Sequence, residues 1–153
     1  GYRSLVKIHE GKGHWMDRED AIALPWMAAF RRNPVPDRIV WIPSGASRRD
    51  SYWLALPQEA PESPGRIAVR HEGQSIVVES AGGADTILVR LDDRLLDPDA
   101  AVRVVAGERV LHEGPVRRTI HTLVRTLLDR GDPELAFPCE LEIRTGARPV
   151  SAP

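Results

Sequence analysis

The chain has 153 residues, of which 42% are hydrophobic and 28% are charged, a composition typical of a soluble globular domain. A formal net charge of −1 excludes the strong positive field that draws proteins to nucleic acid or to anionic membranes. No apolar run approaches the roughly 18 residues of a membrane-spanning helix. The N-terminus has no apolar signal-peptide segment, so either the protein is cytosolic or an upstream signal, removed from a secreted or periplasmic protein, is missing.

The first third of the chain predicts a strand, a loop and a helix. Residues 4–8 alternate weakly and predict a short strand, which ends where Gly11 and Gly13 allow a tight turn. Asp17 is a candidate N-cap for a helix over residues 18–31. Apolar residues recur along this helix at i, i+4 and i+8, which places them on one face. They are Ile22, Trp26 and Phe30.

From residue 38 onward the apolar pattern becomes alternating and predicts strands. Residues 38–42 and 51–56 are expected to pair around a polar turn. Residues 66–80 predict a hairpin around Gly73, residues 102–114 predict a second hairpin, and two further strands are expected at 85–93 and 139–145. Residues 117–130 predict an amphipathic helix that Gly131 ends. Its apolar stripe is expected to face the core, so that truncating Leu127 would be costly.

The predicted fold class is therefore mainly β (α+β). It is a β-sandwich of about seven strands with one amphipathic helix, preceded by a separate strand-loop-helix segment. The proline-rich segment near residues 33–37 predicts the boundary, which gives domains 1–35 and 36–150. On the sandwich helix, the polar side with Arg117, His121 and Arg125 is interpreted as a solvated face.

His14 is the candidate catalytic residue. It follows Gly-Lys-Gly at the end of a predicted strand, and this turn lifts its imidazole away from the sheet edge, where a general base could reach a nucleophile. From local chemistry alone, a loop histidine without a role is an equally good reading. A metal site is not expected, because His9 and His14 are one residue too far apart for the zinc motif H-E-x-x-H.

A longer pattern covers most of the chain. The stretch VKIHEGKGHWMDREDAIALPWMAAFRRNPVPDRIVW, followed later by RT…L..TL..RGDP.LAFP, resembles bacterial esterase-like α/β-hydrolases that carry an appended β-rich C-terminal domain. This resemblance implies that residues 1–35 are the last strand, the histidine loop and the closing helix of the hydrolase domain. It also implies that His14 is the histidine of a serine-histidine-acid triad.

The resemblance implies a serine esterase or a peptidase-like enzyme without a cofactor. The sequence contains no G-x-S-x-G nucleophile motif, and in this fold both the serine and the acid precede the histidine. The chain alone is therefore expected to be catalytically silent. Its expected partners are the rest of the hydrolase domain or a second copy, as a homodimer joined through the N-terminal strand, and neither nucleic acid nor a membrane.

The alternative function is a stand-alone binding or structural β-sandwich module. Its most specific form is carbohydrate binding by Trp41 and Trp53, which lie on the strands that are expected to pair. Packing of both rings in the core is the competing interpretation. Cys139 is the only cysteine, which excludes an internal disulfide, and it is expected to be a buried structural residue.

Overall fold

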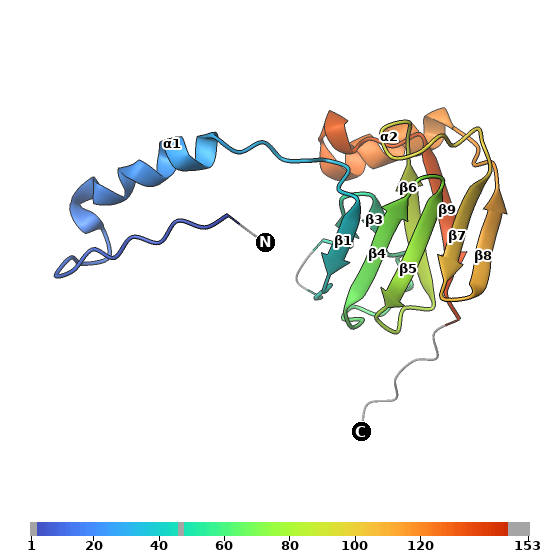
Figure 1. Cartoon of the computed structure of the whole chain (residues 1–153), viewed down its shortest axis with the longest axis horizontal. Helices are drawn as coiled ribbons and strands as arrows, with labels where there is room; N and C mark the ends of the chain where they lie inside the picture. Colours follow the sequence, from blue (N-terminus) through green and yellow to red (C-terminus); the bar gives the residue numbers. More distant parts are fainter. Residues whose placement is uncertain (1–2, 46–47, 147–153) are drawn as a thin grey trace, which may run out of the picture. The chain divides into compact units, whose positions relative to one another are not determined.

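A computed structural model of the chain describes residues 3–45 and 48–146. It divides the chain into two units, Gly1–Asn33 and Pro34–Pro153 (Figure 1).

The first unit contains a 3₁₀ segment, η1 (Met16–Ile22), and a short α-helix, α1 (Ala23–Ala28). Residues 3–9 form no strand, so the predicted strand at 4–8 is wrong. A strand forms only where a neighbour accepts and donates its backbone hydrogen bonds, and the described part of this unit offers no such neighbour. Gly1 and Tyr2, where an N-terminal pairing edge would begin, lie outside the described residues.

The helix of this unit is shorter than predicted. Asp17 is not its N-cap, because Asp17 itself has left-handed backbone angles (φ 51°) and lies inside η1. The α-helix starts at Ala23, so that Pro25 is in its first turn, where a missing N–H costs no helical hydrogen bond. The rings of Trp26 and Phe30 meet edge to face with centroids 4.7 Å apart, as expected for residues four apart.

The second unit is a sandwich of two sheets, which confirms the β-rich fold class. One sheet has the order β1-β4-β5-β7-β8 and the other has the order β2-β3-β6-β9. The strands are β1 (Arg38–Trp41), β2 (Asp50–Ser51), β3 (Leu54–Ala55), β4 (Ile67–Glu72), β5 (Ser75–Ala81), β6 (Thr86–Leu91), β7 (Val102–Ala106), β8 (Arg109–Gly114) and β9 (Cys139–Arg144). The described residues contain nine strands rather than about seven, and residues 50–55 form two very short strands in place of the one that was expected.

Both predicted hairpins are present. In the β4–β5 hairpin Glu72 pairs with Ser75, and the turn between them uses Gly73 at φ 59°, a conformation that glycine adopts without strain. The β7–β8 hairpin is the second. The predicted pairing of 38–42 with 51–56 is wrong: β1 pairs with β4, whereas β3 pairs with β6 in the other sheet. The two segments lie in opposite sheets, and each contributes to the shared core.

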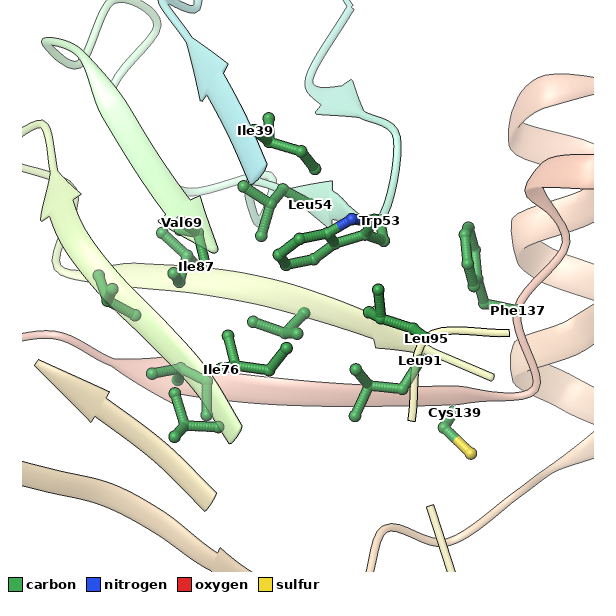
Figure 2. Packing of buried hydrophobic residues seen from close by; sticks show 14 of the residues in the cluster. Ile39, Trp53, Leu54, Val69, Ile76, Ile87, Leu91, Leu95, Phe137 and Cys139 are labelled. Carbon is green, nitrogen blue, oxygen red and sulfur yellow. The ribbon is translucent and has the colours of Figure 1, made fainter. Parts of the chain in front are cut away.

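The core lies between the sheets (Figure 2). Trp53 is fully buried at its centre, and its indole N–H donates a hydrogen bond to the Pro36 carbonyl at 2.7 Å, which satisfies the one polar atom of the ring. Phe137 and Cys139 are also fully buried. The expectation of a structural cysteine is thereby confirmed, and burial raises the pKa of its thiol.

Helix α2 (Ile120–Arg130) ends where the sequence predicts, with Gly131 in the left-handed conformation at its C-cap. Thr119 caps its start by accepting a hydrogen bond from the Thr122 N–H at 3.0 Å. A short 3₁₀ turn, η2 (Pro133–Leu135), then leads toward β9.

The orientation of α2 is the reverse of the prediction. Its five apolar residues are all exposed, and Thr126 is its only fully buried residue. The Thr126 hydroxyl accepts a hydrogen bond from the Phe137 N–H (2.8 Å) and donates one to the Thr122 carbonyl (2.9 Å). The polar side of α2 therefore packs on the sandwich. The expectations of a core-facing stripe and of a costly Leu127 truncation are both corrected.

This orientation predicts an unusual mutational pattern on α2. Thr126→Val should lower the free energy of unfolding by about 1–3 kcal/mol, because it leaves the buried Phe137 N–H without an acceptor. Leu128→Ala should change it by less than about 0.5 kcal/mol, because Leu128 is 77% exposed. Urea denaturation followed by circular dichroism measures both. A larger loss for Leu128→Ala than for Thr126→Val would contradict the observed orientation.

Candidate functional site

The candidate site is the segment from His9 to Glu19, here called the His14 loop. Its backbone turns sharply: Gly11 has φ 69°, and the consecutive residues Met16, Asp17 and Arg18 also have positive φ. The Met16 N–H donates to the Gly13 carbonyl at 3.1 Å. Three consecutive left-handed non-glycine residues are costly and need support from their surroundings.

A cluster of ionic side chains supports this turn. His9 Nδ1 lies 2.9 Å from a Glu19 carboxylate oxygen, and Lys12 Nζ lies 3.0 Å from the other oxygen of Glu19 and 3.1 Å from Asp17. The hydrogen bond from His9, followed by that from Lys12, lowers the pKa of Glu19. The same carboxylates raise the pKa of Lys12. The cluster joins both ends of the His14 loop.

His14 lies outside this cluster. Its side chain is exposed, and its ring meets the Trp15 ring nearly edge-on, with centroids 5.2 Å apart. Among the described residues no hydroxyl or carboxylate is hydrogen-bonded to the His14 ring. The Glu19 carboxylate of the same loop contacts His9 and Lys12 instead. Residues 3–33 therefore present an accessible imidazole that is hydrogen-bonded to neither a serine nor an acid.

Three further histidines lie in the sandwich, and two of them contact its backbone. His71 is in β4 and His112 is in β8, and each places its Nε2 next to the carbonyl of a turn or strand-end glycine, Gly73 and Gly114. His121 is exposed on α2. Within residues 3–45 and 48–146, no three His, Cys, Asp or Glu side chains are grouped so that they could hold a metal ion. In the same residues no helix has the length and apolarity to cross a membrane.

The outer face of the smaller sheet carries a charged cluster that sequence reasoning missed. Arg90 in β6 is 4% exposed, and its guanidinium lies 2.9 Å from Asp129, 3.1 Å from Glu140 and 3.5 Å from Asp50. Arg125 also pairs with Glu140, at 2.8 Å. A pocket of about 570 Å³ opens beside these residues. The signal in the sequence was an arginine within the apolar strand TILVRL.

The carboxylates in this cluster are all paired with arginines. Asp50, Asp129 and Glu140, which line the pocket, bind arginines of the strands or of α2. The cluster therefore links α2 to the sheet. The expected solvated face of α2 is corrected here for Arg125, which binds the sheet. Arg117 and His121 are exposed, as expected.

The aromatic pair proposed for carbohydrate binding is not formed as expected. Trp53 has no exposed surface, so it offers no ring face to a sugar. Trp41 is in β1, in the sheet opposite to that of β2 and β3. Packing in the core is the role of Trp53, and Trp41 packs against the same core from its edge.

Comparisons of this chain with family models, with curated proteins and with solved structures give no match.

The ionic cluster of the His14 loop predicts a measurable titration. The Glu19 carboxyl should titrate below its ordinary value of 4.5, and His9→Ala should raise its pKa more than Lys12→Ala, because His9 is the larger cause. Since the folded pKa is below the unfolded one, the contact stabilises the loop above the unfolded pKa and is lost as pH falls through the folded pKa. Carbon-13 NMR of the carboxyl group measures this. An unchanged midpoint in His9→Ala would contradict the contact.

The charged cluster predicts a large effect of Arg90. Arg90→Ala should lower the free energy of unfolding by about 3–5 kcal/mol, because three carboxylates lose a buried partner. Arg90→Lys should not restore it, since a single ammonium cannot bridge three carboxylates as a planar guanidinium does. Arg144→Ala is the control: this β9 side chain is 88% exposed, and its loss should cost less than about 0.5 kcal/mol. Equal effects in urea denaturation would show that the cluster is not structural.

Proposed function

We propose that the chain is the C-terminal part of a serine α/β-hydrolase of esterase or peptidase-like type, with His14 as the triad histidine and Pro34–Pro153 as an accessory β-sandwich. One observation carries the proposal beyond the sequence resemblance. None of residues 3–33 is buried within the chain, although the segment contains many large apolar side chains. Those that are exposed include Leu5, Val6, Ile8, Trp15, Ile22, Leu24, Met27 and Phe30.

Such a segment is incomplete by itself. Apolar surface of this extent normally marks a contact with another protein surface, and helices as short as α1 are not stable alone in water. The closing segment of an α/β-hydrolase has this character, because it packs on a sheet that earlier parts of the domain supply. The same packing would bring His14 to the nucleophile.

The chemistry assigned to His14 follows from its exposure. Both ring nitrogens are open, so one can accept the proton of a serine hydroxyl while the other donates a hydrogen bond to an orienting carboxylate. The imidazole would then return the proton to the leaving group of the ester or amide. The ionic cluster of His9, Lys12 and Glu19 has a positioning role, because it holds the turn from which His14 projects.

A stand-alone binding module is the alternative function, favoured by the complete core of Pro34–Pro153. The two proposals differ in what the reading frame upstream of Gly1 encodes. The hydrolase proposal requires a G-x-S-x-G motif and an acidic residue in that frame, and the binding module requires neither. Reading that frame is the direct test.

The hydrolase proposal predicts a loss of activity that depends on His14. In the polypeptide that includes the complete hydrolase domain, His14→Ala should lower kcat/KM for p-nitrophenyl butyrate by at least about 10³-fold, as expected for a triad histidine. His9→Ala is the comparison variant: it removes a contact that holds the turn but leaves the His14 imidazole in place, so it should lower kcat/KM far less than His14→Ala. A variant pair with the opposite result would overturn the assignment of His14.

The 153-residue chain by itself should hydrolyse the same ester no faster than an equal concentration of free imidazole, because the serine and the acid are absent. The His14→Ala form of the chain serves as the blank. A turnover that exceeds imidazole and disappears in His14→Ala would show that the chain is itself an esterase, which would contradict the proposal.

A further inference from the structure

Helix α2 presents an apolar surface outward from the sandwich. The surface, here called the α2 face, consists of Ile120, Leu123, Val124, Leu127 and Leu128, which recur at i, i+3, i+4, i+7 and i+8. Ile120 is 81% exposed and Leu128 is 77% exposed. Within the part of Pro34–Pro153 that the structure describes, no element covers this face.

The sandwich itself prevents α2 from turning this face inward. Thr126 is bonded to the Phe137 backbone, Arg125 is paired with Glu140, and Asp129 is paired with Arg90. Rolling the helix would break all three contacts and would leave the guanidinium of Arg90 short of one of its partners, which is expensive in a buried position. These three contacts therefore keep the α2 face directed away from the sandwich.

We propose that the α2 face is the surface on which the sandwich docks against the α/β-hydrolase domain to which Gly1–Asn33 belongs. This inference rests on the proposed function and names the partner of the accessory unit. The surface that it meets is expected to be apolar, because every residue of the α2 face is aliphatic and none offers a hydrogen bond.

The point of attachment supports this partner. The chain enters the sandwich at Pro34, and the Pro36 carbonyl accepts the hydrogen bond of the Trp53 indole. The Trp53 carbonyl in turn accepts from the Arg90 N–H, and the Arg90 side chain binds Asp129 of α2. The entry point and α2 thus lie at the same end of the sandwich (Figure 1). The covalent link between the sandwich and the preceding part of the chain therefore starts at the end of the sandwich that carries the α2 face.

The size of the α2 face favours an attached domain over a second copy. Its five side chains expose on the order of 500 Å², similar to the largest apolar patch of an ordinary monomer. Two copies face to face would bury roughly 1,000 Å², less than the roughly 1,200–2,000 Å² of stable complexes. For an attached domain the effective concentration is in the millimolar range, so a small interface suffices.

The test compares the amide exchange of α2 in two polypeptides, the 153-residue chain and the polypeptide that includes the complete hydrolase domain. Docking predicts at least about tenfold slower exchange of residues 120–130 in the longer polypeptide. In that polypeptide Leu128→Asp should restore fast exchange and increase the radius of gyration in X-ray scattering. Val110→Asp is the matched control, since Val110 is an exposed apolar residue of β8 (44%), and it should change neither.

Each other outcome overturns the proposal in a recognisable way. Equal exchange of α2 in both polypeptides, with esterase activity present, rejects docking and leaves the proposed function intact. A reading frame without a hydrolase domain rejects both. A concentration-dependent dimer of the 153-residue chain in sedimentation equilibrium that Leu128→Asp dissolves would assign the α2 face to a second copy. Circular dichroism melting of the Leu128→Asp chain verifies that the variant is folded.

Discussion

The ion pairs of Arg90 determine which side of helix α2 faces the sheet and which side faces outward. Arg90 projects from the outer face of β6 and binds carboxylates from β2, α2 and β9. A guanidinium that is 4% exposed is tolerated only when its charge and its donors are matched. Because Asp129 supplies part of this match, α2 must turn its polar side toward the sheet. The apolar side of the helix is left outside as a direct consequence.

A second group of ion pairs lies at the start of the same helix. Arg118, just before α2, binds Asp93 at 2.6 Å and Asp99 at 3.2 Å, and the guanidinium lowers the pKa of Asp93. The contact joins the segment after β6 to the approach of α2. Exposed pairs add little free energy individually, but this one fixes the direction from which the helix enters. Arg118 thus fixes the position at which α2 starts, whereas Arg90 and Arg125 fix which side of α2 faces the sheet.

Sequence reasoning succeeded where local geometry decides the outcome. The β4–β5 hairpin was predictable because the apolar alternation and Gly73 specify one turn, and the end of α2 was predictable because Gly131 adopts the left-handed cap. It failed where the outcome depends on which other segment an element packs against or pairs with. The periodicity of α2 defines an apolar face without saying what that face meets, and residues 4–8 have strand-like alternation but no strand beside them. The pairing of β1 was likewise a choice between two sheets that local pattern does not distinguish.

The candidate site follows the same rule. The glycines around Lys12 predict a turn, and the structure has one, but a triad is defined by groups that converge from distant parts of a chain. Neither His14 nor the α2 face is required by the structure of the unit that carries it. The sandwich core would be unchanged if Ile120 or Leu128 were polar, because neither side chain reaches it, and the turn at Gly11 would form with another residue in place of His14. The contacts described within each unit therefore do not account for the identity of these residues.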